Sequence, residues 1–547
     1  MSLFRPRSRR HENMSAGGTV ANAVVEVFER REISGWIEVE PGSAPVRVGL
    51  FINDDEVAAT WAMARTGRRV AGELRKFRFA LYDLWRFTSH TDRVSVRVAG
   101  HPLPIAGKGT FYRPKQDGAE SLPVLKRRLA SGYVFGQGGR LQLSKSVDTK
   151  WQSTVMGLYS RVNAALEDGF GYQAFLCYGT LLGAVREGGF IGHDLDFDCA
   201  YLSKHSDSSA VLAELKAIAF YLIDRDFDVI AKRTCLAIRD KASDGVKIDL
   251  FHLFYDQAGE IRFPFGVAGT STFHKSQFTH TRAIQLAGHP ALVPNSAELL
   301  LEHIYGADWR TPNPGFNWQN DRTISAREGI ISVDDVEEVY WANFYARASY
   351  ERGSTFCDFV AGQSGLPGVV IDIGCGDGRD SYAFAKAGKR VVGIDRSHVG
   401  IRHATAKSEK LGYGADIEFK ACDVNDGQRL RDIIEQARIG NAEPLLFYLR
   451  FFLHSISAET QHALMELLRQ CSHPGDVLAA EFRTDKDETK TKVHAKHFRR
   501  YQNGPAFAAA LADEYGFEVR IQQEGNGFSP YNGEDPELFR VVAHRKG

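Results

Sequence analysis

The stretch FLCYGTLLGAVREGGFIGHDLDFDCAY, Phe175 to Tyr201, decides how the middle of the chain folds. Its first residues, FLCY, form a short apolar and aromatic run that predicts a β-strand. Gly179 then permits a sharp turn into a helix that ends at a Gly-Gly pair. Thr180 offers a hydroxyl and a backbone N–H at the start of this helix. We expect Gly179, Thr180 and Arg186 to bind phosphate.

Three alternating carboxylates follow this helix: Asp194, Asp196 and Asp198. In a strand, residues two apart share one face, so these side chains are expected to project together while Leu195 and Phe197 face a core. Carboxylates placed in this way repel one another unless a cation lies between them, and Mg²⁺ or Mn²⁺ accepts such oxygens and bridges to substrate phosphates. We expect Asp196 and Asp198 to hold the metal, with Asp194 assisting. The alternative is a solvated acidic loop.

A second predicted strand, KIDLF at Lys247 to Phe251, carries Asp249 among apolar residues. A Gly-Thr turn, a carboxylate pair and a third carboxylate on a neighbouring strand make up the palm of nucleotidyltransferases. We therefore predict a central α+β nucleotidyltransferase-like palm over residues 148–320. Asp249 is the expected group for orienting or deprotonating an acceptor hydroxyl. The catalytic set is Asp194, Asp196, Asp198 and Asp249.

The sequence of this region resembles the LicD family, which includes phosphocholine transferases of bacterial surface polysaccharides and the fukutin-related ribitol-phosphate transferases. The likeness rests on YGTLLGAVREGGFIGHDLDFD, on KIDLF and on PNSAELLLEHIYGADWRTP at Pro294 to Pro312. It implies a CDP-linked donor and transfer of a phosphorylated substituent to a glycan hydroxyl, as in lipopolysaccharide or capsule. Two alternatives stay open: a nucleotidyltransferase that consumes CTP or ATP, and a non-catalytic glycan-binding scaffold.

A second glycine-rich signature, GVVIDIGCGDGRDSYAFAKAGKRVVGIDRS, begins at Gly368. It predicts an apolar strand, a G-x-G-x-G loop, a helix and a second strand that ends in Asp395. Glycines let a ligand approach the backbone, and a carboxylate at the end of the second strand can accept two ribose hydroxyls. From this unit, the expected cofactor-binding residues are Asp372, Gly374, Gly376, Gly378 and Asp395.

This loop resembles the class I S-adenosylmethionine-dependent methyltransferases more than a dehydrogenase, whose pyrophosphate loop has the form G-x-G-x-x-G. The resemblance implies S-adenosylmethionine as cofactor and an α/β Rossmann-like domain over residues 339–547, with Asp423 beside the adenine. FYLRFFLHSI and EFRTDKDETK also resemble modules of O-antigen chain-terminating enzymes, which methylate a terminal phosphate. Arg450 and His454 flank the expected methyl-transfer edge, and guanidinium groups match phosphate oxygens. We expect both residues at the methyl acceptor.

The rest of the chain is expected to connect and support these two domains. Residues 20–115 contain short alternating segments separated by turn signals, which predicts an N-terminal β-sandwich accessory domain. Residues 108–147, rich in Gly, Lys, Pro and Arg, are expected to link it to the palm. We expect a disordered basic arm over residues 1–19 and a linker over residues 321–338. The predicted fold class is therefore multidomain: β-sandwich, palm and methyltransferase.

Composition limits the partners of the 547-residue chain. Lys plus Arg and Asp plus Glu both number 68, so no overall field draws the protein to nucleic acid. Seven scattered cysteines without a C-x-x-C pair favour a reduced compartment. The sequence shows neither a signal peptide nor a transmembrane stretch. We expect a cytoplasmic, bifunctional enzyme that modifies cell-surface polysaccharide. Peripheral contact of its basic N-terminus with the inner face of the inner membrane stays open.

Overall fold

A computed structural model of the protein describes residues 22–64, 72–312, 316, 318, 328–347, 352–439, 443–492 and 498–547. The basic arm expected over residues 1–19 lies outside these residues. By its internal contacts the chain divides into two compact units: Met1–Val211 with Lys241–Gly329, and Leu212–Asp240 with Ile330–Gly547. The chain is therefore multidomain, and Leu212–Asp240 clusters with the C-terminal part although it is remote from it in sequence.

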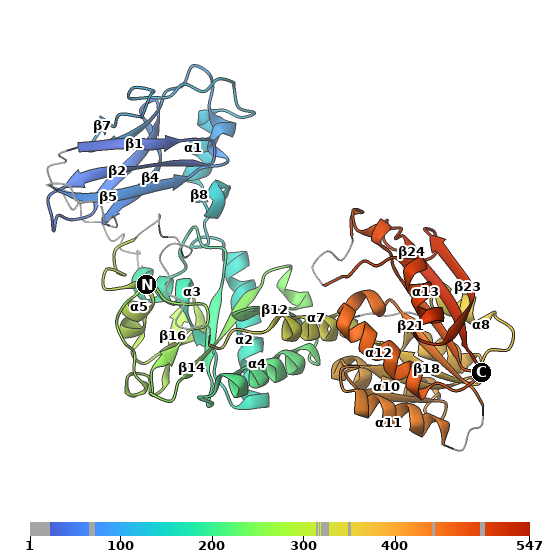
Figure 1. Ribbon diagram of the computed structural model, residues 1–547. Coiled ribbons are helices and arrows are strands. Elements are labelled where there is room, and N and C mark those ends of the chain that lie inside the picture. Colours follow the sequence, from blue (N-terminus) through green and yellow to red (C-terminus); the bar gives the residue numbers. More distant parts are fainter. Residues whose placement is uncertain are drawn as a thin grey trace, which may run out of the picture. The chain divides into compact units, whose positions relative to one another are not determined.

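The first part of the chain is a β-rich region, as predicted (Figure 1). Its strands are β1 (Asn22–Phe28), β2 (Glu32–Val39), β3 (Val46–Ile52), β4 (Asp55–Ala64), β5 (Glu73–Ala80), β6 (Val94–Val98) and β7 (His101–Pro102). They form a sheet of order β1-β2-β5-β4-β3-β6-β7 with antiparallel pairing. The segment after β7 also hydrogen-bonds to Val25 of β1, so the two edges of the sheet are bridged.

The segment expected as a linker, 108–147, belongs in large part to this β-rich region. It contains α1 (Leu122–Ala130) and a small hairpin of β8 (Tyr133–Phe135) and β9 (Leu141–Leu143). Leu125 of α1 is fully buried in the same core as Val25 and Ile37. The segment is therefore more than a linker, because apolar residues of α1 and of the hairpin pack against the core of the sheet, and composition alone does not reveal these contacts.

The central region of the first unit contains the first acidic motif. Its elements are α2 (Thr149–Phe170), β10 (Phe175–Leu176), α3 (Tyr178–Leu182), a π-helical turn (Gly183–Glu187), β11 (Asp198–Leu202), β14 (Ile248–Tyr255), β15 (Ile261–Arg262), β16 (Thr281–Leu286), β17 (His289–Pro294) and α5 (Ala297–Tyr305). Asp148 caps α2 and accepts a hydrogen bond from the backbone N–H of Trp151. β11 pairs in parallel with β14, and β10 lies antiparallel to β11.

Three elements that lie between β11 and β14 in the sequence belong to the second unit in whole or in large part. They are the helix α4 (Ser208–Ile223) and the strands β12 (Asp228–Lys232) and β13 (Cys235–Arg239), which pair as an antiparallel hairpin. The linker expected over residues 321–338 is described only from residue 328, and it runs into the helix α7 (Val333–Arg347). The domain boundary expected at 338/339 thus falls inside α7.

The C-terminal domain is a three-layer α/β fold, as predicted (Figure 1). Its strands are β18 (Val369–Ile373), β19 (Arg390–Asp395), β20 (Ile417–Ala421), β21 (Leu445–Arg450), β22 (Val477–Arg483), β23 (Phe517–Gly525) and β24 (Leu538–Arg545). Its helices are α8 (Thr355–Ala361), α9 (Arg379–Lys386), α10 (His398–Leu411), α11 (Gly427–Arg438), α12 (Ala458–Cys471) and α13 (Gly504–Asp513). The sheet order is β20-β19-β18-β21-β22-β24-β23. The strands from β20 to β22 pair in parallel, and β24 pairs antiparallel with both β22 and β23.

Both faces of this sheet are buried, which explains its continuous apolar strands. Ile371 and Phe447 belong to one hydrophobic core, whereas their chain neighbours Val370 and Leu446 belong to the other. All seven cysteines lie within the described residues and are buried free thiols. Among the described helices, none is both long and apolar enough to cross a membrane.

Candidate functional sites

The Gly-Thr turn holds Asp198 by two backbone contacts. The N–H of Gly179 donates to Oδ2 of Asp198 at 3.1 Å, and the N–H of Asp198 donates to the hydroxyl of Thr180 at 2.8 Å. A Cβ atom on Gly179 would lie 2.4 Å from Oδ2 of Asp194, so only glycine fits beside this carboxylate. Tyr178, which precedes it, has a φ of 41°, a strained conformation for a residue with a side chain. The turn is thus shaped around two of the predicted carboxylates.

The other two residues expected to bind phosphate are already engaged within the protein. Thr180 is buried and its hydroxyl accepts the Asp198 bond. Arg186 donates from Nε to Glu187 at 2.8 Å and from Nη1 to the backbone oxygen of Trp309 at 3.2 Å. Trp309 belongs to the YGADW segment that carried the family resemblance. Arg186 therefore ties this segment to the turn.

The acidic motif is only partly a strand. β11 begins at Asp198, so Asp194 and Asp196 precede it in an irregular segment. Phe197 is fully buried as expected, but Leu195 is 45% exposed, and the prediction that it faces the core is wrong. Without strand geometry, alternate residues do not share a face. Asp198 and Asp249 are nevertheless register partners on the parallel strands β11 and β14, which brings the first and second acidic motifs together.

Two residues join this site that sequence reasoning did not assign to it. Lys247 places its Nζ atom 3.1 Å from Asp196 and 3.2 Å from Asp249, so one ammonium group bridges the two motifs. Tyr305, at the end of α5, lies within electrostatic reach of Asp198 and Asp194. Lys247 is part of the KIDLF segment, and its position two residues before Asp249 was the available signal.

The pKa values show that negative charge accumulates around Asp198. Desolvation raises the pKa of Asp198 well above its usual range, and the neighbouring carboxylates of Asp194, Asp196 and Asp249 raise it further. Desolvation, helped by Asp196, also raises the pKa of Asp194 to about 6. Burial, followed by the charges of Asp198 and Asp194, raises the pKa of the Tyr305 hydroxyl well above its usual value. Lys247 therefore leaves the carboxylates incompletely neutralised.

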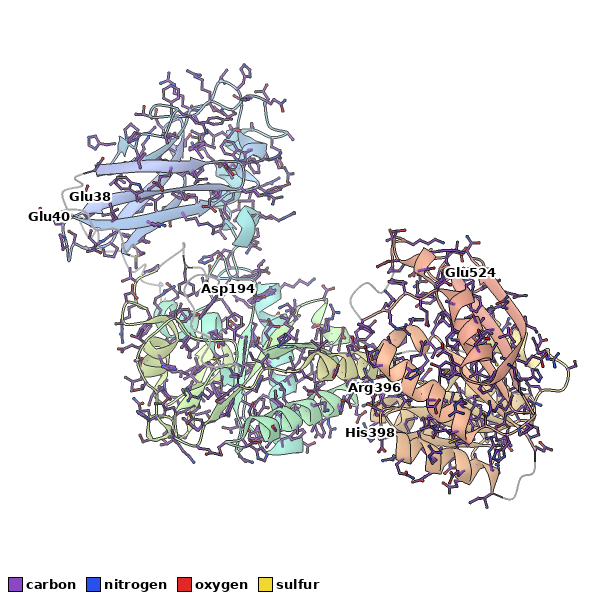
Figure 2. The ribbon with its side chains drawn as sticks, viewed as in Figure 1. Glu38, Glu40, Asp194, Arg396, His398 and Glu524 are labelled. Carbon is purple, nitrogen blue, oxygen red and sulfur yellow. The ribbon has the colours of Figure 1, made fainter. Side chains whose placement is uncertain are left out.

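The donor chemistry of this cluster fits a hard divalent cation, which binds carboxylate oxygens. The pairing of Asp198 with Asp249 on neighbouring strands supports this fit, and Asp194 and Asp196 also lie near enough to act on the Asp198 carboxylate. In the described part of the chain, however, no three His, Cys, Asp or Glu side chains lie close enough together to hold a metal ion as they stand. Lys247 occupies the space between Asp196 and Asp249. Figure 2 marks Asp194 among the side chains of this region.

The second site begins at the glycine loop after β18. Gly374, Gly376 and Gly378 have φ values of 81°, 58° and 80°, the left-handed region that favours glycine. A Cβ atom on Gly374 would lie 2.3 Å from the ring of Phe452, and one on Gly376 would lie 2.4 Å from the ring of Tyr345. The loop is therefore a cradle without side chains, and it fits the close approach of a nucleoside-bearing cofactor.

The predicted carboxylates stand at the ends of successive strands around this loop. Asp395 ends β19 and accepts hydrogen bonds from the N–H groups of Gly376 at 3.0 Å and Ser397 at 2.8 Å. Asp372 is buried and accepts the Ser381 hydroxyl at 2.6 Å. Desolvation raises the pKa of Asp372 to about 7. Asp423 follows β20, is exposed, and lines the same cavity as the other two.

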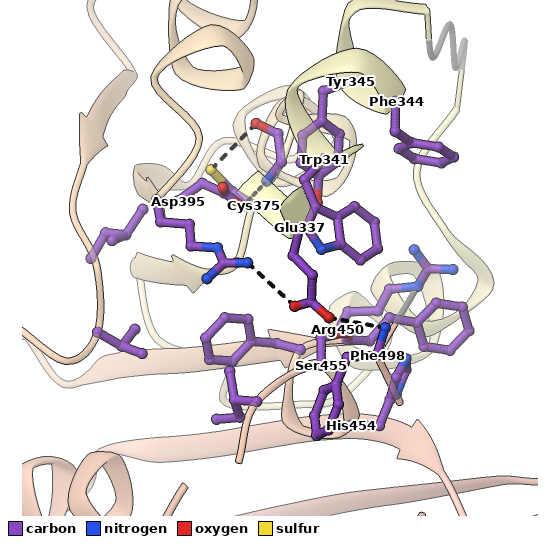
Figure 3. A pocket seen from close by; sticks show the side chains of 18 of the residues that line it. Glu337, Trp341, Phe344, Tyr345, Cys375, Asp395, Arg450, His454, Ser455 and Phe498 are labelled. Atoms are coloured by element: carbon purple, nitrogen blue, oxygen red, sulfur yellow. Dashed lines mark hydrogen bonds and ion pairs between the residues drawn. The ribbon is translucent and has the colours of Figure 1, made fainter. Parts of the chain in front are cut away.

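The cavity in front of these residues has a volume of about 1280 Å³. Small-molecule sites usually span roughly 300–1,000 Å³, so this one has room for a cofactor and part of an acceptor. Arg450 and His454 line it together with Phe451, Ser455 and Arg499. Figure 3 shows Arg450, His454 and Ser455 along one side and Asp395 with Cys375 along another. The predicted cofactor and acceptor residues therefore share one cavity.

Buried carboxylates hold Arg450 in place. Its Nε lies 3.4 Å from Glu481 and 3.9 Å from Asp380, and its Nη2 donates to the hydroxyl of Ser529 at 3.2 Å. His454 is buried and its Nδ1 accepts the backbone N–H of Arg483. The neutral imidazole then carries its proton on Nε2, as a hydrogen-bond donor. Both groups can thus donate to an anionic acceptor.

Other basic residues near this edge differ in their roles. Arg483 lines the cavity but pairs with Asp487 and Glu534. Arg500 donates to the backbone oxygens of Leu453 and Ile456, so it braces the loop that carries His454.

Comparison with known proteins assigns two family domains to the chain. Residues 171–296 match the model of the LicD/FKTN/FKRP nucleotidyltransferase domain, and residues 367–504 match that of a methyltransferase domain. Both families recognised in the sequence are therefore confirmed. The two matches support a bifunctional transferase, and the second supports S-adenosylmethionine as its cofactor.

One curated relative, the uncharacterized protein T07A5.1 of Caenorhabditis elegans, is 28% identical over 177 residues. This alignment covers 31% of the present chain and 47% of the relative, so the chain spans about half of that protein's length.

Several solved structures are similar to part of the chain. One is an S-adenosylmethionine-dependent methyltransferase from Anabaena variabilis, with 18% identity, a TM-score of 0.31, and coverage of 40% of this chain and 96% of that one. Another is the 1,6-didemethyltoxoflavin N1-methyltransferase of Burkholderia thailandensis, solved with S-adenosylhomocysteine. Its identity is 15% and its TM-score 0.29, with coverage of 40% and 92%.

Proposed function

We propose that the chain modifies a cell-surface polysaccharide in two reactions. The central region transfers a phospho-substituent from a CDP-linked donor to a glycan hydroxyl with Mg²⁺ or Mn²⁺. The C-terminal domain methylates the transferred group or a glycan phosphate with S-adenosylmethionine. The glycan, of the lipopolysaccharide or capsule type, and the CDP donor rest on the resemblance to LicD enzymes, and a nucleotidyltransferase-like palm is the proposed central fold.

The observation that carries the first reaction is the pairing of Asp198 with Asp249 on neighbouring parallel strands. Asp196 and Asp198 are the proposed metal ligands, with Asp194 beside them. A bound dication supplies neutralisation of the charge on the donor diphosphate. Asp249 orients the acceptor hydroxyl or takes its proton. Lys247 keeps Asp196 and Asp249 near each other and adds a positive charge toward the leaving nucleotide.

The first reaction is tested by CMP release from a panel of CDP-alcohols, with Mg²⁺ and candidate glycans. We expect release that EDTA abolishes and that Asp198→Asn reduces at least about 100-fold. The matched control is Asp244→Asn, the same change at an exposed residue that pairs with Lys150. Full activity in excess EDTA contradicts the proposal. Pyrophosphate release from CTP or ATP in place of CMP assigns nucleotidyl transfer, and no turnover with any nucleotide favours a scaffold.

The second reaction is supported by the cavity that joins the glycine loop to Arg450 and His454. S-adenosylmethionine supplies an electrophilic methyl group when it is bound. Asp395 is the proposed ribose ligand, with Asp372, Gly374, Gly376, Gly378 and Asp423 around the rest of the cofactor. Arg450 and His454 donate to acceptor oxygens and so fix their position. A phosphate oxygen is already anionic at neutral pH, so no general base is required.

The second reaction is tested by calorimetric titration of S-adenosylhomocysteine into the full chain. Asp395→Ala is expected to weaken binding about tenfold or more, since it removes the ribose acceptor. Asp395→Asn keeps an oxygen that can accept the Gly376 N–H, so the loop structure is retained. A loss of affinity in this variant therefore reports on ribose binding and not on the loop. Asp416→Ala, at an exposed residue before β20, serves as the control. Unchanged affinity in both Asp395 variants would reject this cofactor assignment.

A further inference from the structure

The helix α7 forms one wall of the cofactor cavity. Glu337, Trp341, Phe344 and Tyr345 line the cavity from this helix. Figure 3 shows Glu337, Trp341 and Tyr345 along the helix, with Tyr345 toward Cys375 and Asp395. Glu337 also accepts the backbone N–H of Phe498 at 3.1 Å and lies 3.7 Å from Arg396. α7 is therefore fixed to the rim of the cavity as well as lining it.

Tyr345 packs directly against the glycine loop. A Cβ atom added to Gly376 would lie 2.4 Å from Cε1 of the Tyr345 ring. The same ring packs near Gly400 at the start of α10. Desolvation raises the pKa of its hydroxyl well above the usual value, and the charge of Asp395 raises it further. Trp341 stacks on Tyr345 with ring centroids 5.6 Å apart and an interplanar angle of 22°. These two rings cover the loop beside the proposed ribose ligand.

The opposite contacts of α7 lead to the hairpin β12–β13 and to α4. Asn343 donates to Oδ1 of Asp228 at 2.8 Å and accepts the backbone N–H of Val229 at 3.1 Å. Arg347 forms an ion pair with the same Asp228 carboxylate. Lys216 of α4 bridges Asp335 and Glu338 of α7 at 2.8 and 2.9 Å. Asp228 and Lys216 thus hold the helix at both of its ends.

The electrostatics of Asp228 indicate that this anchor is strong. Burial acts to raise the pKa of Asp228, but hydrogen bonds from Asn343, Arg239 and Arg347 outweigh it and hold the pKa below its usual range. Its side chain is 18% exposed, so solvent screens these contacts less than those of a surface pair. Val339 and Ala342 of α7 are buried beside them. The hairpin and most of α4 lie within the segment that matches the LicD domain and cluster with the methyltransferase unit.

We propose that Tyr345 and Trp341 are cofactor-binding residues of the methyltransferase and that Asp228 is a positioning residue that holds α7 over the cofactor. This inference rests on the proposed use of S-adenosylmethionine. It means that the LicD-matched segment supplies the support for the second active site. When the anchor is lost, α7 lies over the cofactor site in only a fraction of the molecules. The apparent affinity for the cofactor is then reduced in proportion to that fraction.

The test is calorimetric titration of S-adenosylhomocysteine into full-length variants. Tyr345→Ala and Trp341→Ala are expected to weaken binding about tenfold. Asp228→Ala is expected to weaken binding by roughly five- to tenfold, although Asp228 does not line the cavity. Asp228→Glu, which restores the charge, should recover part of the loss. Asn343→Ala, a milder change of the same anchor, decides the matter if Asp228→Ala does not fold. The control is Glu466→Ala, which breaks the exposed Glu466–Arg469 pair on α12.

Two further measurements distinguish the proposed roles of Asp228 and Trp341 from a purely structural role. In methyl transfer, Asp228→Ala should raise KM for S-adenosylmethionine and leave kcat within about twofold, because the anchor acts on cofactor binding alone. Ligand-induced change of tryptophan fluorescence should be reduced in Trp341→Phe. Wild-type affinity in folded Asp228→Ala and Asn343→Ala overturns the anchor. Wild-type affinity in Tyr345→Ala and Trp341→Ala overturns the cofactor contacts. If wild type itself does not bind the ligand, the proposed cofactor function fails first.

Discussion

Lys247 is the residue that most changes the interpretation of the central site. Its ammonium group lies between Asp196 and Asp249, where it offsets part of the charge that a metal would otherwise neutralise. Asp249 and Asp196 raise its pKa, although desolvation opposes them. Lysine and a divalent cation therefore compete for the same carboxylates.

This competition predicts the behaviour of Lys247→Met. The variant should bind Mg²⁺ about tenfold more tightly than wild type, because one nearby positive charge is removed from a partly solvated site. Thermal unfolding across a Mg²⁺ titration measures the effect, since a ligand that binds the folded state raises the melting temperature with its concentration. Lys150→Met, at the exposed partner of Asp244, is the control. A melting temperature that Mg²⁺ does not raise in Lys247→Met would contradict the prediction.

The pKa of about 6 at Asp194 predicts a pH dependence of stability. Between the ordinary pKa near 3.8 and about 6, the folded state holds a proton that the unfolded state has lost. The free energy of unfolding therefore falls as pH rises through this window, and the stabilising share is fully present only below it. In the absence of metal, Asp194→Asn should remove this decrease in the free energy of unfolding. Thermal unfolding measured in EDTA at pH values from 4 to 7 would detect the difference between variant and wild type. A wild type and variant with parallel curves would exclude it.

At the same scale, the sequence was sufficient to predict the local structure around residues that belong to a compact motif. The glycines of the loop, Asp395 and Asp198 belong to short motifs that carry their own geometry. Tyr305 and Lys247 join the site through pairing of remote strands and packing of α5, and no local spacing encodes that approach. Leu195 was misassigned because a short period-2 pattern also occurs in irregular segments before a strand.

Among the elements, the glycine loop makes the strictest demand on the sequence. Gly376 has a φ of 58° and faces the ring of Tyr345, so Gly376→Ala combines backbone strain with a clash. We expect it to weaken S-adenosylhomocysteine binding at least about tenfold and to destabilise the fold by about 1–2 kcal/mol. Gly388→Ala is the matched control, because Gly388 has a φ of 77° but open space around its Cα. It should show similar destabilisation with unchanged affinity. Equal loss of affinity in both variants would assign the effect to general strain.

The helix α7 shows why an element can escape sequence analysis. Its sequence, VDDVEEVYWANFYAR, does not segregate apolar from polar residues into a single stripe. It contacts the β12–β13 hairpin with Asn343 and Arg347 and the cofactor cavity with Trp341 and Tyr345. A helix with partners on two sides has no single buried face, and its first residues, up to 338, were therefore assigned to a linker. By contrast, the strands β18 and β19 around the glycine loop were predicted, with β19 ending at Asp395, because buried parallel strands form continuous apolar runs.

For the whole molecule, the division into compact units does not follow the two family matches. Leu212–Asp240 lies inside the LicD-matched segment but clusters with the methyltransferase. Boundaries drawn from motifs alone would therefore cut through shared structure, including α7. The arrangement gives a physical reason for keeping both catalysts on one chain, and it is separate from any transfer of product between them.

The order of the two reactions is the prediction at this largest scale. Two catalysts on one chain raise the effective concentration of one site's product at the other, which is useful when that product is the next substrate. We expect methyl transfer to the glycan to be undetectable until the central region has acted. In a coupled reaction with labelled S-adenosylmethionine, Asp198→Asn should lose both modifications and Asp395→Ala only the methyl group.

A rescue arm distinguishes this order from a structural effect of the substitution. Glycan that wild type or Asp395→Ala has already modified with the CDP-linked donor should be methylated by Asp198→Asn at a rate within about twofold of wild type, because Asp198 is not among the residues that line the methyltransferase cavity and independent sites act additively. Arg450 and the Nε2 of His454 can both donate hydrogen bonds to a ligand, so an acceptor that already carries phosphate suits their edge of the cavity better than a neutral sugar. Equal labelling of glycan never exposed to the donor would show that the two reactions are independent decorations of one polymer.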